Sequence, residues 1–167
     1  MFSIGDKVVY PVHGAGIVES IETRTILGEQ KNYYVLRIRT NDMKLMVPVE
    51  AVSGVGMRSV IAAEAVEQVL CVLREAESEF CETWNKRYRN NMEKIRSGDI
   101  CQVAEVVRGL TLRKLSKGLS SGEGRLLDSA RQILISELTL AREWEEETVS
   151  LMIDRLFVKP SDEMVTL

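Results

Sequence analysis

The chain has 167 residues, a formal net charge of −3 and 45% hydrophobic residues, which is typical of a globular protein with one domain or two small ones. Its three cysteines have no CxxC spacing and it has a single histidine, so we expect no metal site and no cofactor. No Walker-type loop, GxSxG or GxGxxG motif occurs, so we do not expect an enzyme. The N-terminus lacks a secretory signal pattern and no apolar run approaches the roughly 18 residues that span a membrane, which favours the cytoplasm.

Residues 1–56 carry the pattern of a small β-sheet. Strands are predicted at residues 7–10, 17–26, 33–39 and 44–49, with a last short strand at 51–55. The segments between them are rich in glycine, asparagine, aspartate and proline, which favour turns. Five short strands at this spacing are typical of a strongly bent antiparallel sheet, and we expect a Tudor- or SH3-like barrel. Small barrels of this kind usually bind a partner through a sheet edge or face.

Arg24 is a candidate binding residue in this region. It lies between Thr23 and Thr25 on the longest predicted strand. Two interpretations are open: a strand arginine that faces solvent, or an anchor for an acidic or carbonyl-rich partner.

A helical domain is predicted over residues 59–159, followed by a tail at residues 160–167. Beyond the glycine-containing junction at residues 54–58, the spacing of apolar residues changes from two to 3.6. Five helices are predicted, at residues 59 to about 77, 84–96, 100–116, 121 to beyond 138, and 148 to about 158. The expected fold class is therefore α+β, with a small antiparallel barrel followed by a compact five-helix domain.

Several of these helices have clear start signals. Ser59, Thr83, Asp99 and Ser120 are predicted N-caps, and Ser120 with Glu123 has the form of a capping box. Trp144, in an acidic neighbourhood, is predicted to pack, partly buried, between the last two helices.

The helix predicted at residues 84–96 is strongly basic in a chain that is otherwise mildly acidic. At 100° per residue, apolar side chains form one face and cations surround the rest. The apolar face holds Trp84, Tyr88, Met92 and Ile95, and the cations are Lys86, Arg87, Arg89, Lys94 and Arg96. One interpretation is an amphipathic core helix whose polar face is basic. The other is a nucleic-acid-binding helix, with Trp84 as a wedge or stacking group and the cations on phosphate.

A series of local patterns runs in order along nearly the whole chain, to about residue 158. The first are Gly5-Asp6-x-Val8-Val9-Tyr10-Pro11-x-His13-Gly14, Ile21-Glu22-Thr23-Arg24-Thr25-Ile26-x-Gly28-Glu29-Gln30 and Val47-Pro48. The later ones are Trp84-x-x-Arg87-Tyr88, Ser97-Gly98-Asp99, Val103-Ala104-Glu105-Val106-Val107-Arg108 and Ala130-Arg131-Gln132-Ile133-Leu134. The series resembles the bacterial CarD family of the short CarD/CdnL type. The first module is also similar to the polymerase-interacting domain of transcription-repair coupling factors.

The resemblance implies a regulator that binds the β subunit of RNA polymerase and stabilises the open promoter complex. In such proteins the Tudor-like domain binds polymerase, and the helical domain contacts DNA at the upstream edge of the bubble without reading its sequence. A tryptophan there wedges into the minor groove and slows bubble collapse, and Trp84 matches it. Arg87 and Arg89 match neighbouring basic positions, and Lys86 is expected to face phosphate beside them.

The resemblance also implies a set of polymerase-binding residues, and the chain departs from the family at two positions. The implied set is Thr23, Arg24, Thr25 and Met46. Met46 stands where the family often has a second contact arginine. Gly124 stands where a basic residue usually follows the capping-box glutamate, and the adjacent Arg125 is expected to contact DNA instead. Both departures bear on the strength of the contacts.

One rival function is kept open. The protein would then be an adaptor that docks its helical domain onto polymerase without contacting DNA. In either case a monomer that associates with the nucleoid through polymerase is the expected functional form, with a strand-swapped dimer as the alternative.

Overall fold

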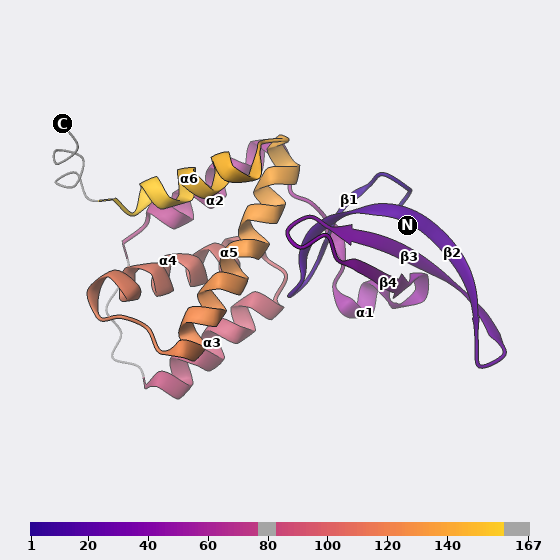
Figure 1. The fold of residues 1–167 in the computed structure, drawn as a ribbon, viewed down its shortest axis with the longest axis horizontal. Helices are drawn as coiled ribbons and strands as arrows, with labels where there is room; N and C mark the ends of the chain where they lie inside the picture. The colour runs from indigo at the N-terminus through magenta and orange to yellow at the C-terminus, as the bar shows by residue number, and fades with distance from the viewer. Residues whose placement is uncertain (77–82, 159–167) are drawn as a thin grey trace.

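A computed structural model describes residues 1–76 and 83–158 of the chain. It has two lobes, an N-terminal β-sheet and a C-terminal bundle of helices (Figure 1). The α+β class and the antiparallel sheet are confirmed. The predicted tail at residues 160–167 lies outside the described residues. The first helix, predicted to end at about residue 77, ends earlier, at Arg74, and the chain is extended at Glu75. No helix in the part of the chain that the structure describes is long and apolar enough to cross a membrane.

The sheet has the spatial order β4-β3-β2-β1-β5, with every neighbouring pair antiparallel. Its strands are β1 Lys7–Tyr10, β2 Gly14–Ile26, β3 Glu29–Ile38, β4 Lys44–Pro48 and β5 Arg58–Ser59. β2 and β3 form a long curved hairpin that extends away from the helices (Figure 1). A register shift between Val18 and Ser20 marks an irregularity of the β-bulge type, which bends a strand. Closure of the sheet into a barrel stays a prediction.

The strand predicted at residues 51–55 is wrong. That segment forms a 3-10 turn, Val49–Ala51, followed by the short helix α1, Val52–Val55. Val52 and Val55 are three residues apart, which is a helical spacing, and both pack against the core of the sheet. Gly56 ends α1 in the left-handed region at φ 77°, where glycine has no steric penalty. The last strand is β5, which lies beyond residue 56 and pairs with β1.

The helices of the second lobe are α2 Val66–Arg74, α3 Trp84–Arg96, α4 Ile100–Ser116, α5 Ser121–Arg142 and α6 Glu146–Leu156. The predicted caps at Thr83, Asp99 and Ser120 are confirmed, since each side chain accepts a backbone N–H of its own first turn. Ser59 is not a cap because it belongs to β5, and α2 begins only after the 3-10 turn Ala63–Ala65. α6 begins two residues before the predicted position, with Glu146 and Glu147 in its first turn, where carboxylates complement the helix dipole.

Among the described residues, each lobe has its own hydrophobic core, and a small third cluster of Val9, Ala15 and Leu140 lies between the sheet and α5. The larger core is built by α2 to α6, and its fully buried members include Val66, Val107, Leu134, Leu138 and Ile153. The smaller core lies under the sheet and includes Val8, Val18, Tyr34 and Leu36. Trp144 packs, partly buried, against the larger core, as predicted, and Arg142 lies 5.3 Å from the centre of its ring.

The two lobes are joined by a polar clasp between α5 and the sheet. The Glu137 carboxylate, fully buried, accepts from both terminal nitrogens of Arg58 on β5 at 2.7 and 2.9 Å and from the Ile61 backbone N–H at 3.0 Å. Next to it, the Ser136 hydroxyl accepts the Ala15 backbone N–H at 2.9 Å. Arg58 also donates to the Gly98 carbonyl at 2.8 Å, which ties the turn after α3 to the same point. The clasp therefore sets where α3 lies relative to the sheet.

Candidate nucleic-acid interface

Trp84 is the first residue of α3 and stands at the end of the helical lobe. The residue is 43% exposed, although it is one of the largest apolar residues in the chain. Its ring stacks on Tyr88, with centroids 5.0 Å apart and an interplanar angle of 16°. Its indole N–H donates to the Ser120 hydroxyl at 3.0 Å. One face of the indole is therefore supported by the protein, while the residue as a whole remains open to a partner.

The rest of the apolar face of α3 anchors the helix to the core. Ile95 is 3% exposed, and Tyr88 and Met92 pack against the larger core as partly buried residues. The apolar face predicted from the sequence is thus divided. Its later members hold the helix in place, and its first member, Trp84, is presented at the end.

Arg87 lies largely inside the protein, in contact with a carboxylate. Its side chain is 20% exposed and donates to both oxygens of Glu123, at 2.9 and 3.1 Å. Glu123 is 1% exposed, and the adjacent Arg87 guanidinium lowers the pKa of its carboxyl below the ordinary value. The geometry gives Arg87 a supporting role between α3 and α5, rather than the outward, phosphate-facing orientation expected from the sequence.

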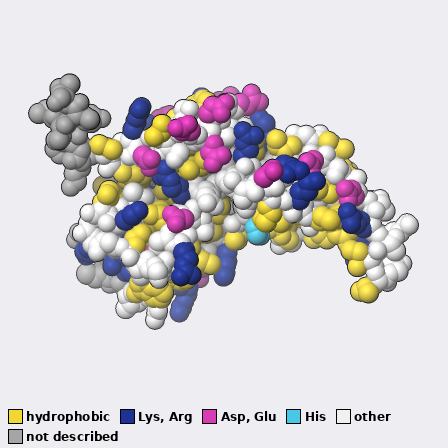
Figure 2. All heavy atoms as spheres, viewed as in Figure 1, with side chains coloured by type: hydrophobic (Ala, Val, Ile, Leu, Met, Phe, Trp, Pro, Cys, Tyr) yellow, Lys and Arg dark blue, Asp and Glu magenta, His cyan; other side chains and the backbone are white. Residues whose placement is uncertain are grey.

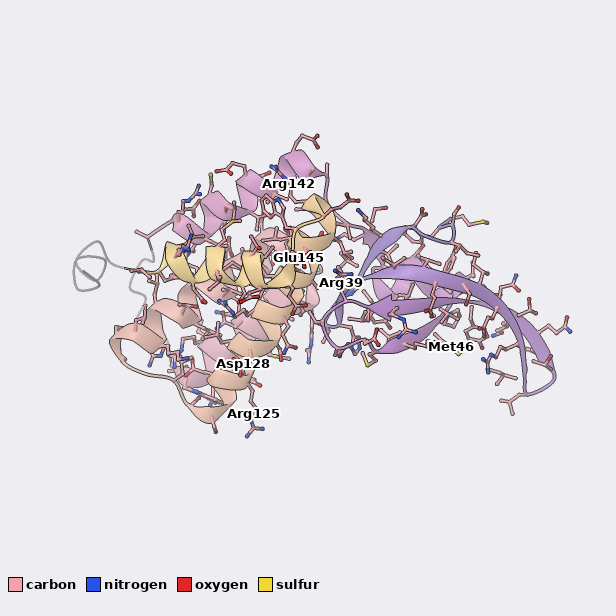
Figure 3. The ribbon with its side chains drawn as sticks, turned by 45° about the horizontal axis from the view of Figure 1, so that its top comes forward. Arg39, Met46, Arg125, Asp128, Arg142 and Glu145 are labelled. Carbon is pink, nitrogen blue, oxygen red and sulfur yellow. The ribbon has the colours of Figure 1, made fainter. Side chains whose placement is uncertain are left out.

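The other three expected DNA-binding cations are exposed. Lys86 and Arg89 lie on the outer surface of α3, and Arg125 lies in the second turn of α5. Figure 3 shows Arg125 projecting outward from the lower end of α5, near Asp128. Because Arg89 follows Trp84 by five residues, it points about 140° away from Trp84 around the helix. The structure therefore brings Trp84 and α5 together but places Arg89 on another side of α3.

Charge is unevenly distributed over the helical lobe. Dark-blue side chains project at its lower end in Figure 2, and acidic side chains gather along its upper edge. That upper edge is the region of α6, whose start is flanked by Glu143, Glu145, Glu146 and Glu147. Trp84 thus lies at the opposite end of the lobe from the acidic residues around the start of α6.

On the sheet, Arg24 and Met46 share a face and the two threonines do not. Ser20, Val35 and Met46 are cross-strand partners, and Arg24 lies four residues beyond Ser20 on β2, roughly 13 Å further along the strand. Since successive side chains alternate between faces, Thr23 and Thr25 point to the opposite face. The four residues expected to bind polymerase therefore do not form one patch.

Both residues on the shared face are accessible. The Arg24 side chain is 54% exposed and donates to the Glu22 carboxylate at 2.9 and 3.2 Å. Met46 is 42% exposed and lies on β4, which is an edge strand of the sheet. On the opposite face, the Thr23 hydroxyl donates to Asn32 at 2.7 Å, which ties it to the neighbouring strand.

Two structural features were not predicted from the sequence. Ser120 and Glu123 were recognised as a capping box, but their contacts with Trp84 and Arg87 span 36 positions in the sequence. The other feature is the tip of the β2–β3 hairpin, where Ile26 and Leu27 are 50% and 100% exposed. The signal for the tip is the apolar pair directly before Gly28, at a turn where polar residues are the norm.

Comparison with known proteins covers both lobes. The model of the CarD-like/TRCF RID domain matches residues 2–61, and that of the CarD C-terminal domain matches residues 68–154. The candidate transcription factor YdeB of Bacillus subtilis (strain 168) is 38% identical over 149 residues, which are 89% of this chain and 97% of that protein. A solved structure, CdnLNt from Myxococcus xanthus, is 44% identical and covers 36% of this chain and 86% of its own, with a TM-score of 0.32.

These matches confirm the resemblance drawn from the sequence motifs. They imply regulation of transcription through interaction with RNA polymerase, in a class of proteins that generally lacks enzymatic activity. The chain belongs to the CarD/CdnL family of transcription factors.

Proposed function

We propose that this protein binds the β subunit of RNA polymerase through its sheet and stabilises the open promoter complex by placing Trp84 in the DNA at the upstream edge of the bubble. The observation that carries the proposal is the setting of Trp84, which is 43% exposed yet stacked on Tyr88 and hydrogen-bonded to Ser120. A side chain held in this way loses little conformational freedom when it inserts at a base step.

The charge of the chain supports a tethered DNA binder rather than an autonomous one. The net charge is −3, and the acidic residues around the start of α6 lie on the same lobe as Trp84. Affinity for free duplex is therefore expected to be low and to fall steeply with salt. Docking on polymerase raises the effective concentration of the helical lobe at one DNA position, so a weak wedge suffices.

The sheet supplies a surface suited to docking. β4 is an edge strand, which offers unpaired backbone groups to a strand of a partner. Met46 on this strand and Arg24 on the same face add an apolar contact and a positive charge. We assign this edge and face to the polymerase β subunit, and the clasp at Glu137 then holds Trp84 at a set position from it.

A second candidate is the adaptor that binds another protein, not DNA, through its helical lobe. The observation that favours it is the pairing of Arg87 with Glu123, which engages one of the cations expected on phosphate. DNA remains the first choice because Trp84 is presented at the end of the lobe, and because Lys86, Arg89 and Arg125 are exposed.

The test is the lifetime of the open complex on one weak promoter. Trp84→Ala should shorten the lifetime that the protein confers by about tenfold, which corresponds to ~1.4 kcal/mol. It should keep its helical circular dichroism and its binding to a β-subunit fragment. The matched control is Leu151→Ala on α6, which removes an apolar side chain of similar exposure, 49%, from the acidic region. An unfolded Trp84→Ala protein, or one with full activity, would contradict the wedge role.

The docking surface is tested separately. Arg24→Glu should abolish binding to the β-subunit fragment, because it replaces the positive charge of the proposed contact with a carboxylate next to Glu22. The helical lobe should stay folded. The control is Arg155→Glu, which reverses an exposed charge on α6. Unchanged binding by Arg24→Glu rules out the assigned surface. Capture of forked promoter DNA with the β fragment, lost in Trp84→Ala, distinguishes the DNA-binding function from the adaptor.

A further inference from the structure

The Ser120 hydroxyl connects Trp84 to a buried ion pair. It accepts the Trp84 indole N–H at 3.0 Å and the Glu123 backbone N–H at 3.2 Å, and it lies 3.4 Å from the Glu123 carboxylate, to which it donates. A hydroxyl has one donor and two acceptor positions, so all three are used. The hydroxyl proton is therefore directed at Glu123 and its lone pairs at Trp84 and the backbone.

Glu123 is fixed in turn from the opposite side. Its carboxylate receives two charge-assisted hydrogen bonds from Arg87, one helical turn after Trp84 on α3. Arg113 on α4 lies 4.0 Å from the same carboxylate. A loop of contacts thus runs from Trp84 through Ser120 and Glu123 to Arg87 and back along α3, and it ties the first turns of α3 and α5 together.

This loop restrains the direction of the indole. Trp84 has two side-chain torsions, and stacking on Tyr88 leaves the ring free to slide in its plane, whereas the hydrogen bond to Ser120 fixes where the N–H edge points. The first turn of α5 also lies against the ring, since a Cβ at Gly122 would be 3.6 Å from the indole Cζ2 atom. The accessible part of Trp84 is therefore the part that these contacts leave uncovered.

We infer that Ser120 is a positioning residue for Trp84, with Glu123 and Arg87 as the ion pair that orients the Ser120 hydroxyl. The inference rests on the proposed insertion of Trp84 into DNA and assigns these residues the role of holding the indole ready before DNA is met. Pre-orientation lowers the entropic cost of insertion, so its loss weakens the wedge while the ring itself is intact.

The experiment uses the full chain with Trp144→Phe, so that Trp84 is the only tryptophan. In this background Ser120→Gly removes the hydroxyl but keeps a residue type that is well tolerated at N-cap positions. In the free protein we expect lower fluorescence anisotropy and greater acrylamide quenching of Trp84, with an unchanged helical signal. Ser120→Thr, which keeps the hydroxyl, should restore both values.

A double-mutant cycle tests whether the hydrogen bond between Ser120 and Trp84 contributes to the open-complex lifetime. Ser120→Gly should shorten the open-complex lifetime about three- to tenfold when residue 84 is Trp, the range expected for one hydrogen bond. It should have no further effect when Trp84→Phe has already removed the N–H. Equal effects in the two backgrounds would show that Ser120 acts only as a helix cap and would overturn the inference.

The two proposals fail in different ways. If the starting protein does not prolong open complexes, the proposed function is wrong, while fluorescence of the free protein still tests the positioning. If Ser120→Gly leaves Trp84 anisotropy and quenching unchanged, the positioning role is wrong whatever the lifetime shows.

Discussion

Two ion pairs, each between a buried glutamate and a partly exposed arginine, lie toward opposite ends of α5 and support different contacts. Glu123 near the start of the helix pairs with Arg87 of α3, and Glu137 near its end pairs with Arg58 of β5. The carboxylates are fourteen residues apart, which is about 21 Å along a helix axis. The first pair supports Trp84, and the second joins the helical lobe to the sheet.

The difference lies in what surrounds each pair. Glu137 also receives the Ile61 N–H, and Arg58 also donates to the carbonyls of Ser59 and Gly98, so the pair joins several separate segments. Glu123 has Ser120 as its second partner, and through it reaches Trp84. The same kind of ion pair therefore joins the two lobes at one end of α5 and supports a binding residue at the other. α5 carries both pairs, so one helix connects the junction with the sheet to the support of Trp84.

Breaking the junction pair should have the largest effect. Glu137→Ala leaves the Arg58 guanidinium and the Ile61 N–H without their carboxylate, and removal of one partner of a buried pair costs about 3 to 5 kcal/mol. We expect about 3 kcal/mol, since Arg58 is partly exposed. Urea unfolding followed by circular dichroism measures it. Glu67→Ala, which breaks an exposed pair with Arg74, is the control and should change little. Equal stability of the two variants would show that the clasp is not needed.

Breaking the Glu123–Arg87 pair beside Trp84 should lower the stability less than Glu137→Ala does. It should shorten the open-complex lifetime more than Glu137→Ala does. Glu123→Gln keeps the size of the side chain and loses the charge, and a hydrogen bond to a charged group contributes about 1.5 to 3 kcal/mol. The expected loss is therefore about 2 kcal/mol, measured by urea unfolding. In a cycle with Arg87→Met the two changes should be strongly non-additive. Additive effects would mean that the pair contributes nothing as a pair.

The smallest expected effect is on the pH dependence of stability, which isolates the contribution of the Glu123 charge. The pKa of Glu123 is lowered in the folded protein by Arg87, so the unfolded chain takes up its proton first as the pH falls. The resulting stabilisation is fully present above the ordinary pKa of about 4.3 and is lost as the pH falls through the lower folded value. Unfolding free energies of the wild type and of Glu123→Gln should therefore converge as the pH falls below the ordinary glutamate pKa of about 4.3. A gap that widens toward low pH would contradict this sign.

Local signals predicted much of the fold. Thr83, Asp99 and Ser120 were identified as caps because a cap depends on residues within one helical turn. The strand predicted at residues 51–55 failed because a short apolar run fits a strand or a helix equally well, and packing of Val52 and Val55 on the sheet decided for the helix. The prediction of Ser59 as a cap is wrong because Ser59 pairs with Val8 of β1 and is part of the sheet.

The candidate site shows the same division. The role of Trp84 as a binding residue is predicted from the family motifs, and its exposure is seen only in the structure. The face-sharing of Arg24 and Met46 follows from strand register, which the sequence leaves undefined. Arg87 was expected on phosphate because its charge is visible in the sequence and its buried partner is not.

The sequence by itself determined the two-part α+β organisation, most helix starts and the membership of the CarD/CdnL family, because these depend on periodicity, capping and motif order along the chain. Only the tertiary structure decided which cations remain outward and what holds Trp84. Those contacts join Ser120 to Trp84 across 36 positions and Glu137 to Arg58 across 79. Their strength depends on burial and on hydrogen-bond geometry, which exist only once α5 has packed against α3 and the sheet.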